Sequence, residues 1–231
     1  MMNARTVVAC AFAMTIGGNP LNANDLSRYR TFELGTNIDA VSGLTGVASS
    51  EARTVHQRPA LLQELEWRPS RWTRGSTADS TDPVEHIVFS FYDDRLYRIV
   101  VDYGHDRTDG MTDADMIEAI SAVYGTSVKP ARGALRVQSQ VEIESGSPVA
   151  RWGSADGAVV LYRTSSYRET FRLIVTDAAL ADLARKAATE AVRLDEQQAP
   201  QREIARQKKE RDDARAAAEK ARAANKGLFW P

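Results

Sequence analysis

A segment bounded by glycines, residues 110–125 (GMTDADMIEAISAVYG), constrains the fold most, because a shorter version of it occurs at residues 35–46 as GTNIDAVSGLTG. In the longer copy, Thr112 stands at a helix N-cap position, and Asp115 three residues later completes the pattern of a capping box. Apolar residues then recur at spacings of three and four, which predicts one buried helical stripe. Its members are Met116, Ile117, Ile120, Val123 and Tyr124, and Gly125 follows where a helix commonly ends.

The shorter copy predicts a second helix of the same kind. Asn37 takes the N-cap position, Val41 and Leu44 form the stripe, and Gly46 closes the helix. When the opening glycines are aligned, Val41 matches Met116. The closing glycine comes about one helical turn later in the longer copy, so the extra residues lengthen the helix without rotating its buried face. The sequence therefore predicts a duplicated unit.

Sequence typical of β-strands follows each copy. Residues 84–92 and 95–103 both alternate in side-chain character around Asp93 and Asp94, which predicts a β-hairpin. Residues 135–143 alternate strictly between apolar and polar side chains, which is typical of an antiparallel sheet with one solvated face. Further strands are expected at residues 62–67, 158–164 and 167–176, and a short helix is expected within residues 48–57.

The predicted fold class is α+β, with two helix-then-antiparallel-sheet repeats followed by a long charged C-terminal helical extension. The first repeat is assigned to residues 24–108 and the second to residues 109–176, with the helices on one face of the sheet. In the extension, residues 177–231, a narrow apolar stripe at helical spacing runs as far as Pro200, which we expect to interrupt the helix.

Beyond Pro200, the composition favours helix by intrinsic propensity but lacks the recurring apolar residues of a coiled coil. The extension ends in an apolar segment whose large side chains, Leu228, Phe229 and Trp230, are the possible partner-binding residues. Two arrangements are open for them: they fold back into a groove of the same chain, or they contact a partner.

The charge distribution separates this extension from the rest of the chain. Residues 201–226 carry nine Lys or Arg and five Asp or Glu, whereas the whole chain has a formal net charge of −1. Because acidic residues are interleaved with the basic ones, we expect a solvated helix first and a binder of anionic surfaces second. No one-sided basic face of the kind that binds nucleic acid is present, so nucleic acid is not an expected partner.

The N-terminus has the pattern of a signal peptide, assigned to residues 1–23. Arg5 supplies a positive start, residues 7–16 form a short apolar run, and cleavage is expected after Ala23. The alternatives are a short anchor helix or a lipoprotein signal that uses Cys10. Cleavage would leave a periplasmic or secreted chain without cysteine, and hence without a thiol nucleophile, a thiolate metal site or a disulfide. No apolar run reaches the roughly 20 residues that span a bilayer.

We assign no catalytic, cofactor-binding or metal-binding residue from the sequence. Phosphate-binding glycine motifs, a nucleophile elbow and paired zinc ligands are all absent. One polar group is rich in oxygen ligands, which Ca²⁺ or Mg²⁺ prefer. It comprises Asp102, His105, Asp106, Asp109, Asp113 and Asp115. The other interpretation, which we favour, is that these residues turn the chain after a strand and cap the next helix.

The glycine-bounded helices resemble those of the BamE/SmpA type of small envelope domain, which open on Gly-Met-Thr and precede antiparallel strands. The matching residues are Gly110, Met111, Thr112 and Met116 in the second copy, Gly35, Val41, Leu44 and Gly46 in the first, and Trp67 with the hairpin residues 91–94 downstream. Two such units in one chain are similar to the tandem arrangement of β-lactamase inhibitory proteins. The overall pattern also resembles exported bacterial proteins of unknown function.

The leading hypothesis is a non-enzymatic, exported interaction module that binds an envelope component or a protein partner. The alternative is a small ligand-binding protein or hydrolase with a site between the repeats. A third hypothesis is a structural element that self-associates through its C-terminal helix.

Overall fold

The computed structural model describes residues 25–69, 82–130, 145–153, 157–164 and 170–228. The elements in chain order are β1 (Arg28–Tyr29), β2 (Phe32–Glu33), α1 (Ile38–Thr45), the 3-10 helix η1 (Ser49–Glu51), β3 (Arg53–His56), β4 (Leu62–Trp67), β5 (Val84–Tyr92), β6 (Arg95–Tyr103), α2 (His105–Thr108), α3 (Asp113–Tyr124), β7 (Ser147–Gly153), β8 (Gly157–Thr164), β9 (Thr170–Asp177) and α5 (Ala178–Lys226). Residues 1–23, the predicted signal peptide, lie outside the described part of the chain, so that prediction stays a prediction.

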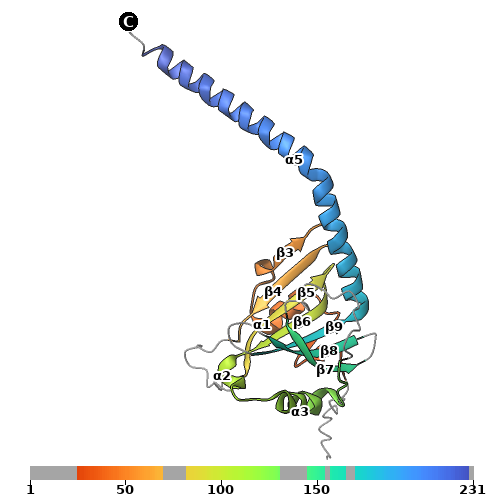
Figure 1. Ribbon diagram of the computed structural model, residues 1–231. Coiled ribbons are helices and arrows are strands. Elements are labelled where there is room, and N and C mark those ends of the chain that lie inside the picture. The colour runs from red at the N-terminus through yellow and green to blue at the C-terminus, as the bar shows by residue number, and fades with distance from the viewer. Residues whose placement is uncertain (1–24, 70–81, 131–144, 154–156, 165–169, 229–231) are drawn as a thin grey trace, which may run out of the picture.

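The described strands form one seven-stranded antiparallel sheet and a small two-stranded sheet (Figure 1). The order in the large sheet is β3-β4-β5-β6-β9-β8-β7, and β1 pairs with β2. At the centre, β6 and β9 pair in the register Val100 with Ile174 and Asp102 with Arg172. The α+β class and the antiparallel sheet predicted from the sequence are therefore confirmed.

The predicted hairpin is present as β5 and β6, joined at Asp93 and Asp94. Both residues have positive φ, 44° and 63°, as a two-residue turn between twisted strands requires. Their carboxylates also accept backbone N–H bonds from elsewhere: Asp93 from Leu61 at 2.8 Å and Asp94 from Ile38 at 3.0 Å. The turn therefore fixes the chain before β4 and the first turn of α1.

The two glycine-bounded helices form as predicted. Thr112 and Asp115 make both hydrogen bonds of the capping box at the start of α3. The Asn37 side chain caps α1 by accepting from the Ala40 N–H at 2.9 Å, and Gly46 ends that helix in the left-handed conformation. The predicted stripes are wrong at two positions, because the side chains of Leu44 and Val123 are exposed.

The main core lies between one face of the sheet and the helices α1 and α3. Val41 from α1 and Met116 from α3 are buried in it. Its strand residues include Leu65, Ile87, Phe89, Phe91, Ile99, Val101, Trp152, Val159, Leu161, Leu173 and Val175. These residues are excluded from water, so their burial is the main favourable contribution to the stability of the fold.

The opposite face of the sheet holds the start of α5. Leu180 and Ala184 from this helix pack against Leu62 and Tyr97 in a second apolar cluster. The helices α1 and α3 therefore share one face of the sheet, as expected, and the apolar stripe of α5 packs on the body, also as expected, by covering the opposite face.

Two segments differ from the sequence prediction, and two predicted strands lie partly or wholly outside the described residues. In place of a helix at residues 48–57, η1 is followed by β3, whose residues pair with β4 and gain ladder hydrogen bonds. The strand β7 was not predicted, and it pairs with β8 around Trp152. The predicted strand at residues 135–143 lies outside the described part of the chain. Of the strand predicted at residues 167–176, residues 167–169 also lie outside it, and the rest falls within β9.

The helix α5 is 49 residues long and continues through Pro200, so the prediction that Pro200 interrupts it is wrong. It starts on the body, bends partway and then extends away from all other labelled elements (Figure 1). Proline removes one helical hydrogen bond and bends a helix. Here Arg202, beyond the proline, bonds Asp195 at 3.0 Å and Gln198 at 3.0 Å, which ties the two segments together. Among the described helices, none is both long and apolar enough to cross a membrane.

Candidate functional site

A polar cluster around the buried Asp102 joins three strands on the face of the sheet that packs α5, with His86 and Arg172 partly buried. Asp102 on β6 accepts a hydrogen bond from His86 Nε2 on β5 at 3.0 Å. The guanidinium of Arg172 on β9 approaches the same carboxylate through two nitrogens, with Nη2 at 2.9 Å from Oδ2. Arg172 also donates to the hydroxyl of Ser145 at 3.3 Å. The cluster therefore bridges the central seam of the sheet.

The cluster shifts the pKa of its two titratable members in opposite directions. Burial alone would raise the pKa of Asp102, but hydrogen bonds from His86 and Arg172, together with the charge of Arg172, outweigh it and hold the pKa below its usual value. The hydrogen bond to Asp102 raises the pKa of His86, and burial only partly opposes it. Each group therefore stabilises the charged form of the other.

This arrangement lacks the geometry of a catalytic triad. His86 bonds the carboxylate through Nε2, and none of the described hydroxyl groups is hydrogen-bonded to its other nitrogen. A nucleophile needs such a base within hydrogen-bond reach. The cluster links the side chains of β5, β6 and β9. The prediction that His86 is a strand residue with a satisfied hydrogen bond is confirmed.

The predicted acidic group does not come together. Asp102 belongs to the cluster above, Asp113 pairs with Arg163 at 2.7 Å, and Asp115 caps α3. Within the described residues, no set of three or more His, Cys, Asp or Glu side chains lies close enough to hold a metal ion. The structural interpretation of this group, as turn and cap residues, agrees with these contacts.

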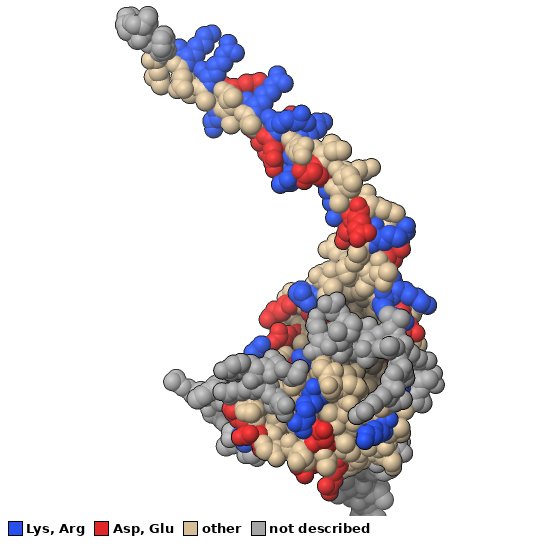
Figure 2. Space-filling model, viewed as in Figure 1, with Lys and Arg blue, Asp and Glu red and all other residues tan. Residues whose placement is uncertain are grey.

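The end of α5 forms an extended, solvated arm. We call residues 201–228 the C-terminal arm and the rest of the described chain the body. Every residue of the arm is exposed, and acidic and basic side chains are mixed along it, with basic side chains predominating towards the tip (Figure 2). Leu228, a predicted partner-binding residue, is 82% exposed at the tip, while Phe229 and Trp230 lie outside the described residues.

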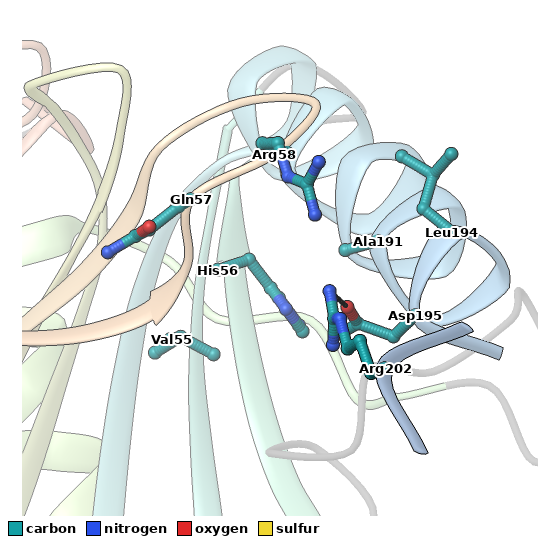
Figure 3. Close-up of a pocket in the computed structure, with 8 residues that line it drawn as sticks. All are labelled: Val55, His56, Gln57, Arg58, Ala191, Leu194, Asp195 and Arg202. Carbon is teal, nitrogen blue, oxygen red and sulfur yellow. Dashed lines mark hydrogen bonds and ion pairs between the residues drawn. The ribbon is translucent and has the colours of Figure 1, made fainter. Parts of the chain in front are cut away.

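The arm leaves the body beside a small polar cavity. We call this the root cavity; it has a volume of about 200 Å³ and is lined by Val55, His56, Gln57, Arg58, Ala191, Leu194, Asp195 and Arg202 (Figure 3). Three of these side chains, His56, Arg58 and Arg202, point into the space between the end of β3 and α5. The cavity brings together the body and both sides of Pro200.

Neither the cluster around Asp102 nor the root cavity was predicted from the sequence. Asp102 and Arg172 are paired across 70 residues of chain, and Arg58 bonds Gln198 across 140. Neither pair has a local sequence pattern, because long-range strand order and the course of α5 bring the partners together.

Comparison of the chain with protein-family models, with curated protein sequences and with solved structures finds no significant match.

Proposed function

We propose that this protein is an exported, non-enzymatic interaction module whose C-terminal arm binds a protein partner of the cell envelope. The observation that carries the proposal is the arm itself: residues 201–228 are all exposed on a helix whose other end is anchored to the body. Because this part of the helix makes no buried contact with the body, it adds no packing energy to the fold. Its proposed role is therefore to contact another molecule.

The start of α5 is anchored to the body, and the arm extends far from it. Asp177 caps the start of α5, and Leu180, Ala184, Ala187 and Ala191 bury one side of its first turns. At 1.5 Å per residue, residues 201–226 extend about 39 Å. The tip is therefore held well away from the body, in a position to contact a second molecule.

The chemistry of the tip favours a protein with an apolar groove. Leu228 is exposed and is followed in sequence by Phe229 and Trp230, so three large apolar residues are consecutive in the sequence after a charged helix. Aromatic residues are enriched among the side chains that dominate binding energy at protein interfaces. Along the helix, ion pairs such as Arg215 with Glu219 keep the arm soluble and do not provide one uniformly charged face.

The proposal also includes export of the chain and duplication of its helix-and-sheet unit. The apolar N-terminal segment supports export. The likeness of α1 and α3 supports two related units, since both are capped in the same way and bury Val41 and Met116 in one core. Each is followed by antiparallel strands, as in the BamE/SmpA resemblance, and the last strands, β6 and β9, lie side by side.

The alternative, a ligand-binding protein or hydrolase with a site between the two units, has less support. The described strands at the junction pair directly, and Ile99, Val101, Leu173 and Val175 beside it are at most 1% exposed. A catalytic or ligand site needs a concave space with convergent polar groups. The packing at this seam favours the interaction module.

Site-specific photo-crosslinking tests the proposal. A photoreactive amino acid replaces Leu228 in the full chain, and in a matched variant it replaces Val123, which is 59% exposed on α3 of the body. We expect one protein adduct from position 228 and none from position 123. A synthetic peptide of residues 217–231 should compete with the adduct, whereas the same peptide with Leu228, Phe229 and Trp230 changed to serine should not.

Two results would contradict the proposal. Equal labelling from both positions would mean that the tip has no partner of its own. An adduct with a second copy of this chain would show self-association through the helix instead.

A further inference from the structure

We propose that the root cavity is a binding site for a phosphate group and that its occupation fixes the direction of the C-terminal arm. This site is separate from the arm tip, and the inference does not depend on the proposed partner. It is carried by the charges that meet in the cavity and by the elements that supply them.

The cavity holds two guanidinium groups next to each other. Arg58, from the loop after β3, donates through Nη2 to Gln198 Oε1 at 2.9 Å. Arg202, from α5, donates through Nη2 to the same oxygen at 3.0 Å. Because one amide oxygen accepts from both, two positive charges are placed side by side. Both side chains are exposed, so water weakens this repulsion without removing it, and a bound anion would relieve it.

The described protein groups supply only part of that negative charge. Asp195 is the one carboxylate among the lining residues, and it pairs with Arg202 at 3.0 Å. Arg58 is left without a carboxylate partner in the described part of the chain. The two arginines and the one aspartate among the lining residues therefore give a surplus of one positive charge.

The two guanidinium groups of the cavity also have N–H donors that the hydrogen bonds given above do not use. A guanidinium has five N–H donors, and the protein bonds given above use only the Nη2 atoms of Arg58 and Arg202. His56 adds an imidazole that has no hydrogen bond from its side chain to the described residues and points into the same space (Figure 3). A donor-rich, acceptor-poor site of this kind suits an anion with several oxygens, and arginine forks match phosphate geometry.

The size of the cavity limits the ligand. Sites for drug-sized molecules usually have volumes of about 300–1,000 Å³, whereas this cavity has about 200 Å³. It therefore suits a free phosphate ion or one phosphate ester, such as the headgroup of a lipid, and not a whole nucleotide.

Binding would act on the arm because the donors come from different parts of the chain. Arg58 belongs to the body, while Arg202 lies beyond Pro200 on α5, a helix that bends partway along its length (Figure 1). An anion that contacts both guanidinium groups would join the body to the arm across the proline. The arm would then keep one orientation relative to the body, where without the anion it would adopt a range of orientations.

Calorimetric titration of the full chain with inorganic phosphate and with glycerol phosphate, at ionic strength held constant with sodium chloride, tests the site. We expect saturable binding that weakens at least about tenfold in Arg58→Gln and in Arg202→Gln, because each removes a bidentate donor. The matched control, Arg215→Gln, removes an exposed arginine of the arm and should bind as the parent does. Tighter binding of glycerol phosphate than of phosphate would identify an esterified group as the natural ligand, and the reverse would identify the free ion.

The arm is followed by electron paramagnetic resonance between spin labels at Glu51→Cys and Lys209→Cys, both exposed positions, with Cys10 changed to serine. Phosphate should narrow the distance distribution in the parent and leave it unchanged in Arg202→Gln. Absence of saturable binding, or equal binding by all three arginine variants, would overturn the site. Binding without narrowing would overturn its effect on the arm.

Discussion

The indole nitrogen of Trp152 lies 3.0 Å from the carbonyl oxygen of Gly125, so a buried side chain of β7 closes the C-terminus of α3. The same N–H is 3.1 Å from the hydroxyl of Ser121. Helix C-termini leave carbonyl groups without partners inside the helix. Trp152 is 0% exposed and supplies one such partner from the core, which fixes the helix against the sheet.

Replacement of Trp152 by phenylalanine should lower the free energy of unfolding by about 1–3 kcal/mol. The aromatic ring keeps most of the apolar contact, but the part-buried carbonyl of Gly125 loses its donor. Urea unfolding followed by circular dichroism measures the change. Trp67→Phe is the control, since Trp67 has no side-chain hydrogen bond among the described contacts; an equal loss in both variants would contradict this role of the indole.

Stability should fall as the pH rises through neutrality because of His86. Its pKa is raised above the ordinary 6.5 by the bond to Asp102, with Glu66 adding to the shift and burial and Arg68 opposing it. A raised pKa in the folded state stabilises the protein fully below pH 6.5, and that contribution is lost as the pH rises through the folded-state pKa. The other charged group that contacts Asp102 is the guanidinium of Arg172.

Unfolding measured between pH 5.5 and 8.5 should therefore show a decline for the parent chain and a flatter curve for His86→Gln. The variant His56→Gln, in the root cavity, should keep the parental decline. A parental slope in His86→Gln would show that another group controls this pH range.

Replacement of Asp102 by alanine should cost about 3 kcal/mol, at the lower end of the range for breaking a buried pair. The change leaves the guanidinium of Arg172 without its carboxylate, and the two side chains are only 23% and 12% exposed. In contrast, Arg68→Ala breaks an exposed pair with Glu66 and should change stability by less than about 0.5 kcal/mol. Chemical denaturation of both variants gives the comparison.

Replacement of Thr112 by alanine should lower stability by about 1 kcal/mol, because it removes the N-cap of α3. Thr189→Ala is the matched control: the same substitution lies inside α5, where alanine is the better helix former, and should be neutral or slightly stabilising. Thermal unfolding of the pair separates the cap from the general effect of losing threonine.

Replacement of Pro200 by alanine should straighten α5. The change restores one helical hydrogen bond and removes the clash with the preceding turn. Small-angle X-ray scattering should show a larger maximum dimension, and circular dichroism should show equal or greater helix content. Unchanged dimensions would mean that contacts at the arm's root, such as Arg202 with Asp195, set the bend without the proline.

The sequence predicts local elements well where the deciding interactions are local. The caps Asn37 and Thr112 and the alternation around Asp93 and Asp94 depend on neighbours within a few residues, and all are found as predicted. The strand β7 and the exposure of Leu44 were missed, because both depend on what the rest of the fold places alongside.

The candidate sites were much less predictable. Leu228 could be singled out because a large apolar residue stands out in a charged segment, and it is exposed as a contact residue must be. The root cavity could not, since Arg58 and Arg202 resemble any other surface arginine until the end of β3 and the bend of α5 come together. The continuation of the helix past Pro200 was missed for a related reason: helical propensity on both sides and the Arg202 contacts outweigh the proline.

The seam between β6 and β9 pairs two strands that are far apart in the sequence. As the chain emerges from the ribosome, β6 is complete long before β9 exists, so its outer edge stays open to any extended polypeptide. Under the proposed export, a chain that crosses the membrane unfolded and then folds would have β9 present when the free edge of the β5–β6 hairpin becomes available for pairing.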